Sequence, residues 1–159
     1  MRINLVCVGK VKESWLREGI AEYSKRLSSS IQLTIREVAE EAAPQTLSDK
    51  EKQQLLLREG ERILKALPAD SYCCALSIDG KSFTSEALAD KLRDLGLHGR
   101  SSVTFIIGSS LGLGINVLTS ADERISLGPL TYPHQLCRLI LLEQLYRANS
   151  IQQGTPYHK

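Results

Sequence analysis

The segment SVTFIIGSSLGLG, residues 102–114, decides the fold of this chain. Its first half, Ser102–Ile107, is a short apolar run rich in β-branched residues, which is typical of a strand buried on both faces. Gly108 ends the run, and the glycine-rich loop that follows lets the backbone turn sharply and approach a ligand closely. A short helix near 117–121 and a further strand at 123–127 are predicted next. This order of strand, loop, helix and strand is typical of a parallel βαβ unit.

The same alternation extends outward to both ends of the chain. Strands are predicted at 3–8, 31–38 and 72–78, the last ending in Asp79-Gly80-Lys81, and helices at 13–27, 48–67 and 85–97, with a long final helix opened by Pro133. In the helix at 48–67, Ser48 and Glu51 have the spacing of a capping box, and the charged residues are expected to face water. Strands separated by helices predict an α/β fold, a parallel-type sheet with helices on both faces. No linker divides residues 1–159, so we expect a single domain.

The composition is that of an ordinary soluble globular protein, with 42% hydrophobic and 24% charged residues. The net charge of +2 neither requires nor excludes a nucleic-acid partner, because binding depends on where the charges lie. No apolar run approaches the roughly 20 residues of a membrane span. The apolar run at the amino terminus is broken at Gly9-Lys10 and is too short for a signal peptide. We therefore expect a cytoplasmic protein with no membrane partner.

Four cysteines are present, and none has the spacing of a CxxC motif or of a zinc site with histidine. No metal site is expected. Cys73 and Cys74 are neighbours in a predicted strand, so their side chains should point to opposite faces of the sheet. Buried thiols that pack as small apolar residues are the favoured interpretation, and a metal or redox role is the alternative.

Three loops follow strands in the second half of the chain, at 76–81, 108–114 and 127–132. Ligands of a parallel α/β sheet bind at the carboxyl ends of its strands, where such loops gather. The middle loop is neither a Walker loop nor a dinucleotide fingerprint. Gly128-Pro129 in the last loop is a compact turn whose free backbone N–H and C=O groups suit an adenine edge. Each loop taken alone is equally typical of a plain turn.

The final helix is apolar around nearly its whole circumference between Leu136 and Tyr146. A helix of this kind must be covered on more than one side. A second subunit is the favoured cover, and burial within one subunit is the alternative.

Polar residues interrupt this helix near both of its ends. His134 and Arg138 lie four apart, hence on one face near the amino end, and Arg147 lies near the far end. The tail that follows carries Tyr157 and His158, a stackable ring and a titratable imidazole. A frayed terminus without function is the alternative for the tail, and a packed, hydrogen-bonded histidine is the alternative for His134.

Taken in order, several segments resemble one family over essentially the whole chain. They are VCVGK at 6–10, FIIG at 105–108 with Gly112-Leu113, LTYPHQ at 130–135, EQLYRA at 143–148 and YHK at 157–159. The chain is identified as similar to the bacterial large-subunit ribosomal RNA pseudouridine N3-methyltransferases of the SPOUT (α/β-knot) superfamily. One departure is Ser109, which stands where the family usually has a second glycine and adds a side chain near the expected methionine end of the cofactor.

The resemblance implies a carboxy-terminal trefoil knot, an exception to the rule against knotted chains. It implies that the knot loops bind S-adenosylmethionine and that the protein is a homodimer with its site near the subunit boundary. It implies methylation of N3 of a pseudouridine in the ribosomal RNA of assembled ribosomes. The matching cofactor positions are Leu76, Gly108, Leu127, Gly128, Pro129, Leu130, Thr131 and Tyr132. A non-catalytic RNA- or ribosome-binding module with the same fold is the alternative.

Methyl transfer from a sulfonium is an in-line displacement, in which correct positioning contributes roughly 7–11 kcal/mol. The imide N3 of pseudouridine must lose its proton to become a good nucleophile, so a base or an anion stabiliser is expected nearby. His134 or His158 is predicted to handle the proton, and Arg138 or Arg147 to contact the anionic ring or a phosphate. Tyr157 is predicted to stack on the base, in a tail that becomes ordered only when RNA binds.

Basic residues around the first predicted helix are the expected phosphate contacts. They are Lys10, Lys12, Arg17, Lys25 and Arg26. A solvated charged face without a partner is the alternative, and the net charge of +2 provides no broad basic surface for naked RNA.

Overall fold

The computed structural model describes all 159 residues and contains one five-stranded sheet. Its strands are β1 (Arg2–Val8), β2 (Gln32–Val38), β3 (Tyr72–Ser82), β4 (Ser102–Ile107) and β5 (Glu123–Ser126). Its helices are α1 (Ser14–Leu27), α2 (Asp49–Ala66), α3 (Ser85–Leu97), α4 (Ile115–Ser120) and α5 (His134–Gln153). The strand order is β2-β1-β4-β3-β5 and every pairing is parallel, which confirms the predicted α/β class.

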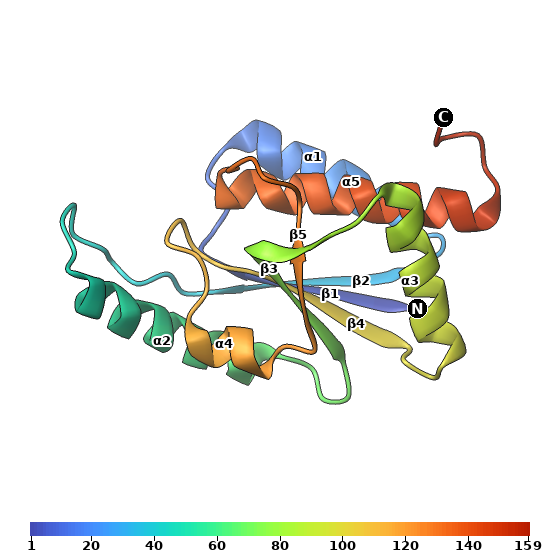
Figure 1. Cartoon of the computed structure of the whole chain (residues 1–159). Coiled ribbons are helices and arrows are strands. Elements are labelled where there is room, and N and C mark those ends of the chain that lie inside the picture. The colour runs from blue at the N-terminus through green and yellow to red at the C-terminus, as the bar shows by residue number, and fades with distance from the viewer.

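Helices cover both faces of the sheet (Figure 1). Side chains of β1 alternate between two cores, because successive residues of a strand point to opposite faces. Leu5 packs into the larger core with α1, α3 and α5, whereas Val6 packs into the smaller core with α2 and α4. All six residues of β4 are buried, as expected for the central strand of a parallel sheet.

The adjacent cysteines of β3 confirm the predicted alternation. Cys74 lies in the larger core and Cys73 in the smaller one. All four cysteines are free thiols, and burial raises the pKa of Cys7 and of Cys74 to about 12. These two thiols therefore stay protonated at neutral pH and pack as small apolar groups.

Side-chain caps fix the beginnings of two helices. Ser48 Oγ accepts a hydrogen bond from the amide of Glu51 at 3.2 Å, and the Glu51 carboxylate accepts one from the amide of Ser48 at 3.3 Å. The predicted capping box of α2 is therefore confirmed. Thr84 caps α3 in a similar way by accepting from the amide of Ala87 at 3.1 Å.

The predicted end of β3 is wrong, because the strand continues past Ile78 to Ser82. Leu76 and Lys81 both pair with Ile125 of β5, so the residues between them leave the ladder and the strand then returns to it. The return depends on Gly80, where a Cβ would lie 2.5 Å from the carbonyl carbon of Ile125. The excursion leaves Ile78 at the carboxyl edge of the sheet.

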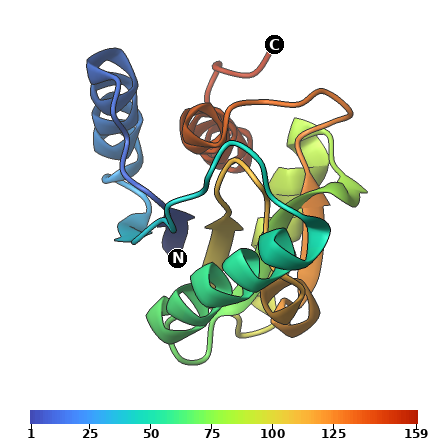
Figure 2. The ribbon, with the colours of Figure 1, turned by 90° about the vertical axis from the view of Figure 1, so that its left-hand side faces the viewer.

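Part of the apolar circumference of α5 is covered within the chain, which was the alternative to a second subunit. Leu141, Leu142 and Leu145 are buried in the larger core. On another side, Leu139 packs so closely on α1 that a Cβ on Gly19 would lie 3.0 Å from its methyl group. Figure 2 shows α5 nearly end-on, with α1 on its left and α3 on its right. Threading of α5 through a preceding loop stays a prediction of the family resemblance.

None of the helices is both long enough and apolar enough to cross a lipid bilayer.

Candidate cofactor and RNA site

Loops far apart in sequence meet at the carboxyl edge of the sheet. The loops around 39–47, 108–114 and 127–133 lie on the same side of the molecule in Figures 1 and 2. The second and third of these loops line a pocket of about 620 Å³, whose lining includes Gly108, Tyr132 and His134. A smaller pocket of about 160 Å³ includes Leu127, Gly128 and Leu130 in its lining.

The two pockets adjoin each other and share part of their linings. Residues common to both linings are Leu76, Thr131, Tyr132 and Cys137. The structure therefore brings together seven of the eight predicted cofactor positions. Pro129, the eighth, lies between lining residues but is not itself part of either lining.

Glycine at two positions of these loops is required by the geometry. A Cβ on Gly108 would overlap the carbonyl oxygen of Gly112, because the loop folds back directly over the end of β4. The amide of Gly112 donates to the carbonyl of Ser109 at 2.9 Å and closes this turn. Gly128 has φ +112°, a conformation that side chains with a Cβ rarely adopt. Its amide donates to Ser126 Oγ at 3.1 Å.

The lining fits a cofactor with a flat ring and a polar tail. Leu76, Ile78, Leu127 and Leu130 supply apolar surface. Both backbone groups of Gly128 are hydrogen-bonded to Ser126, so the backbone groups available to a ring edge are those of Leu130, Thr131 and Tyr132. The size of the larger pocket lies within the roughly 300–1,000 Å³ of typical small-molecule sites. Such a lining is suited to a small molecule with a flat ring that needs apolar contact and a polar end that needs close approach to the backbone.

His134, in the first turn of α5, is the histidine that lines the larger pocket. Its Nε2 is buried and has no hydrogen-bond partner. Burial lowers the pKa of His134, an effect that Glu40 opposes and that Arg138 and Lys12 reinforce. The imidazole is therefore neutral at neutral pH and is able to accept a proton.

Arg138, one turn further along α5, is only 1% exposed. Its Nη1 donates to Glu37 Oε2 at 2.7 Å, and its Nη2 donates to the carbonyls of Val8 and Gly9, both at 2.8 Å. This geometry contradicts the predicted contact of Arg138 with RNA, because the guanidinium is buried and its Nη groups already have partners. Arg138 instead joins the start of α5 to the carboxyl ends of β1 and β2.

The remaining predicted residues form a second cluster at the far end of α5. The guanidinium of Arg147 pairs with Glu143 at 2.6 Å and lies 3.3 Å from His158 Nδ1. Tyr157 OH donates to the same Glu143 carboxylate at 3.2 Å, and His158 Nε2 lies 2.8 Å from a carboxylate oxygen of Glu86. These contacts hold the tail against α5 and α3 in this structure, and ordering of the tail by RNA stays a prediction.

Glu143 is a component of this cluster that the sequence interpretation missed. It lies four residues before Arg147, and that spacing on a helix is the signal that points to an ion pair. The ring of Tyr157 also packs edge-on against Tyr146 with centroids 4.7 Å apart. A hydrogen bond with Tyr23, together with burial and the nearby Glu143 charge, raises the pKa of Tyr157 to about 12. Its hydroxyl therefore stays protonated and donates.

The two clusters do not meet within one chain. His134 and Arg147 are separated by 13 positions on one helix, which corresponds to about 20 Å along its axis. The pocket and His134 lie at one end of α5, while Arg147, Tyr157 and His158 lie towards the other.

The predicted phosphate contacts around α1 divide into two kinds. Arg17 donates to the carbonyls of Val11 and Lys12, and Arg26 pairs with Glu22 at 2.8 Å, so both are engaged within the chain. Lys10, Lys12 and Lys25 are exposed at the surface. The last three remain the cations of this group that are available to a partner.

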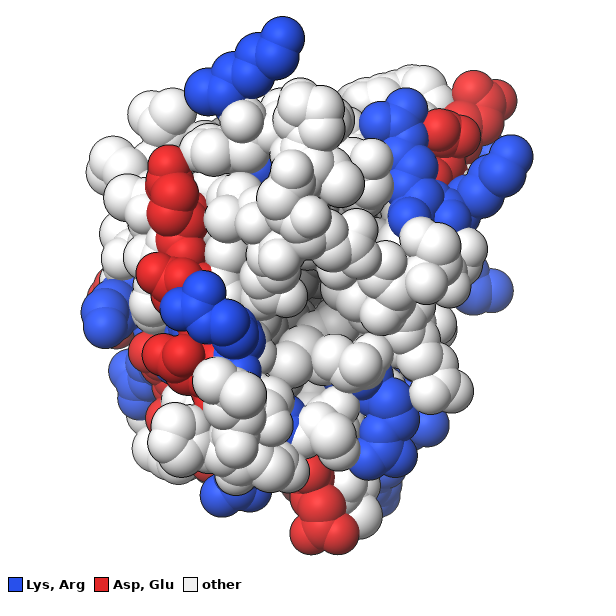
Figure 3. Space-filling model, turned by 90° about the vertical axis from the view of Figure 1, so that its right-hand side faces the viewer, with Lys and Arg blue, Asp and Glu red and all other residues white.

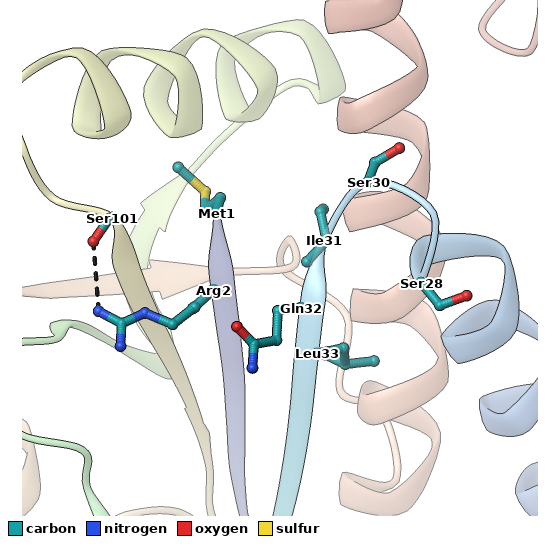
Figure 4. Close-up of a pocket in the computed structure, with 8 residues that line it drawn as sticks. All are labelled: Met1, Arg2, Ser28, Ser30, Ile31, Gln32, Leu33 and Ser101. Atoms are coloured by element: carbon teal, nitrogen blue, oxygen red, sulfur yellow. Dashed lines mark hydrogen bonds between the residues drawn. The ribbon is translucent and has the colours of Figure 1, made fainter.

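A second large pocket lies at the opposite edge of the sheet, where the strands begin. It measures about 640 Å³, and Figure 4 shows Met1, Arg2 and Ser101 in its lining, with Arg2 Nη2 donating to Ser101 Oγ at 3.5 Å. Figure 3, which faces this edge, shows a hollow bordered mainly by uncharged residues. Ligands of parallel α/β sheets bind at the carboxyl ends instead, so this pocket is not the candidate cofactor site.

The fold and the site together define an α/β protein that binds a small ligand at the carboxyl edge of a parallel sheet. The chain matches the family described as "Predicted SPOUT methyltransferase" over residues 1–158, and it belongs to that family. It is therefore a methyltransferase.

Its relatives narrow the class further. Three relatives are named ribosomal RNA large subunit methyltransferase H. This chain is 55% identical to the one from Listeria monocytogenes serovar 1/2a, 54% to the one from Bifidobacterium adolescentis and 52% to the one from Carboxydothermus hydrogenoformans. In each case the match covers 159 residues, which is 100% of both chains.

Proposed function

We propose that this protein transfers a methyl group from S-adenosylmethionine to N3 of a pseudouridine in large-subunit ribosomal RNA, within assembled ribosomes of the cytoplasm. One observation carries the proposal. The irregular part of β3 and the loops after β4 and β5 meet at two adjoining pockets with an apolar lining, glycine turns and unpaired backbone groups at 130–132. Relatives of 52–55% identity are named for methylation of large-subunit ribosomal RNA, which supports the choice of substrate.

Residues of the pocket have distinct tasks in this proposal. When bound, S-adenosylmethionine supplies an electrophilic methyl group on a sulfonium. The 127–132 loop holds the adenine edge with backbone groups, and Leu76 and Leu130 supply the apolar contact. The turn at Gly108 allows the methionine end to lie close to the backbone. Orientation of the two reactants is the main contribution of this chain to catalysis.

Proton removal from N3 is assigned to one of two histidines. His134 lines the pocket, and burial lowers its pKa, so its imidazole is neutral and able to accept a proton. His158 belongs to the cluster with Arg147, whose guanidinium is suited to stabilise the anionic ring or to hold a phosphate. Tyr157 presents an aromatic ring for stacking on the target base.

The protein is proposed to act as a homodimer. The side chains of Ile78 and Leu130 at the edge of the pocket are 67% and 68% exposed, so the pocket is bordered by uncovered apolar surface. A second copy covers that surface and brings its own Tyr157 and His158 to a pocket that they do not reach in their own chain.

Two measurements test the proposed function in sequence. Calorimetric titration with S-adenosylmethionine is expected to show saturable binding, whereas a pure RNA-binding module gives no heat. Labelled cofactor is then incubated with ribosomes that lack the modification, and label is expected at N3 of a pseudouridine of the large subunit. Binding of the cofactor without label in that RNA would refute the proposed substrate.

A further inference from the structure

Glu59, in the middle of α2, is a buried carboxylate outside the site described above. It was expected to face water with the other charged residues of its helix, but it is only 2% exposed. Burial of a charge is costly unless the group is hydrogen-bonded. One oxygen of Glu59 accepts from Ser109 Oγ at 2.8 Å, and the other accepts from the amide of Glu41 at 3.0 Å. A single carboxylate therefore joins two segments that are distant in sequence.

Ser109 belongs to the glycine-rich loop of the pocket. It follows Gly108 directly, and its carbonyl accepts from the amide of Gly112. Its side chain is buried, and its hydroxyl is hydrogen-bonded to α2. This contact explains how the loop accommodates serine where the family resemblance leads us to expect glycine, because Glu59 binds the added hydroxyl.

The other end of the same loop also rests on α2. A Cβ on Gly114 would lie 2.6 Å from the carbonyl oxygen of Leu56, and a Cβ on Gly60 would overlap the side chain of Asn116. Asn116 Nδ2 donates to the carbonyl of Leu57 at 3.1 Å. The helix thus contacts the loop at its end through close backbone packing and at its beginning through the Glu59–Ser109 hydrogen bond.

The second oxygen of Glu59 fixes the segment 39–41. Two arginines of α2 hold the same segment, since Arg62 donates to the carbonyl of Ala39 at 2.9 Å and Arg58 pairs with Glu41 at 3.0 Å. Glu40, between Ala39 and Glu41, is near enough to His134 for its charge to oppose the lowering of the pKa of that residue.

We propose that Glu59 is a positioning residue for methyl transfer. Through Ser109 it sets the place of the cofactor loop, and through the Glu41 amide it sets the place of the segment that faces His134. Glu59 acts on the reaction only through these two contacts. The part of this inference that concerns cofactor binding rests on the proposed function.

A double-mutant cycle tests the connection. Ser109→Ala removes only the hydroxyl and is expected to weaken S-adenosylmethionine binding about 3- to 10-fold, because only part of the roughly 10- to 150-fold effect of one hydrogen bond to a charged group is passed on to the cofactor. Glu59→Ala is expected to weaken it more than about 10-fold, since both contacts are lost. Glu59→Gln should stay within about 3-fold of wild type, because an amide can donate to Ser109 Oγ and still accept from the Glu41 amide.

The combined variant and a matched control separate positioning from general destabilisation. Glu59→Ala with Ser109→Ala should bind no more weakly than Glu59→Ala alone, because Glu59→Ala has already removed the Glu59–Ser109 contact. Ser110→Ala removes the neighbouring, exposed hydroxyl, which makes no contact with Glu59, so its effect should be the same in either background. Independent, multiplying effects of Ser109→Ala and Glu59→Ala would overturn the proposal, as would a loss in Glu59→Gln equal to that in Glu59→Ala.

Amide hydrogen exchange on the cofactor-free protein provides a readout that does not depend on the proposed function. Ser109→Ala should speed exchange at Gly112 and leave the Glu41 amide unchanged, whereas Glu59→Ala should speed both. Absence of cofactor binding by the wild-type protein refutes the proposed function, but the exchange pattern still tests the contacts. If Glu59→Ala does not fold, Ser109→Ala compared with Ser110→Ala decides, and equal exchange at Gly112 in these two variants overturns the proposal.

Discussion

The guanidinium of Arg138 and the carboxylate of Glu37 form an ion pair at 2.7 Å that links α5 to the end of β2. The pair is asymmetric, because the side chain of Arg138 is 2% exposed and that of Glu37 is 39% exposed. Most of the stabilisation therefore comes from the buried arginine, which also satisfies the carbonyls of Val8 and Gly9.

Replacement of the two partners should have unequal effects. Arg138→Met leaves two carbonyls at the end of β1 without a donor and is expected to reduce the free energy of unfolding by about 3 kcal/mol. Glu37→Gln leaves a partly solvated acceptor and is expected to cost about 1 kcal/mol or less, after allowance for solvent screening. Urea denaturation of both variants measures the difference. Equal losses would contradict the assignment of Arg138 as the structural member of the pair.

The lowered pKa of His134 predicts a loss of stability in mild acid. The unfolded chain takes up this proton near the ordinary histidine pKa of about 6.5, whereas the folded protein takes it up only at lower pH. The unfolded state therefore binds more protons in this window, so the contribution is present above about pH 6.5 and is lost as the pH falls.

His134→Gln keeps a polar side chain but removes this titration. The melting temperature of wild type minus that of His134→Gln should decrease between pH 7.5 and pH 5 in the same buffer series. A difference that stays constant or increases towards acid would show that burial does not disfavour the imidazolium. If His134 is also the base, kcat/KM of the wild type should fall over the same range.

The parallel sheet was predictable because local pattern and burial agree in this chain. The fully buried strand at 102–107 reads as a continuous apolar run, and the capping box at Ser48 needs only residues three apart. The convergence of Gly108 and Leu130 followed from the rule that loops at carboxyl ends meet at one edge.

Other features depend on contacts that no local pattern contains. The return of β3 to its ladder needs Gly80 to lie against Ile125, a residue 45 positions later. Glu59 looks like a solvent-facing residue on a charged helix until Ser109 and Glu41 are placed beside it. The burial of Arg138 likewise depends on the ends of β1 and β2, which the helical pattern of α5 does not reveal.

Glycine at position 108 should be essential for the cofactor pocket. Gly108→Ala places a Cβ against the carbonyl oxygen of Gly112 and must displace the loop, so binding of S-adenosylmethionine should weaken more than about 10-fold. Gly96→Ala is the matched control, because that helical position has no atom closer than 3.5 Å to the added Cβ and lies in α3. Isothermal titration of both variants compares them, after circular dichroism has shown that they are folded. Cofactor binding in Gly108→Ala as tight as in Gly96→Ala would contradict the assigned pocket.

Loss of the tail should separate chemistry from cofactor binding. Tyr157→Ala combined with His158→Ala is expected to reduce methyl transfer at least about 100-fold, the range for loss of a catalytic acid or base. The Kd for S-adenosylmethionine should change less than about 3-fold, since neither residue lines the pocket. Equal losses of both properties would refute this division.

Mixing two inactive variants tests whether the tail acts on the pocket of a second copy. One variant carries Gly108→Ala, and the other carries Tyr157→Ala with His158→Ala. If each pocket uses the tail of its partner, a mixed dimer contains one intact pocket with an intact tail. Random pairing then restores about a quarter of the wild-type activity per chain, because half of the dimers are mixed and each has one working site. If each pocket uses its own tail, neither site of a mixed dimer is complete and activity stays at the level of the separate variants.

Co-expression with two affinity tags, followed by transfer assays on the doubly tagged fraction, distinguishes these outcomes. That fraction should show about half of the wild-type rate if each pocket uses the tail of its partner.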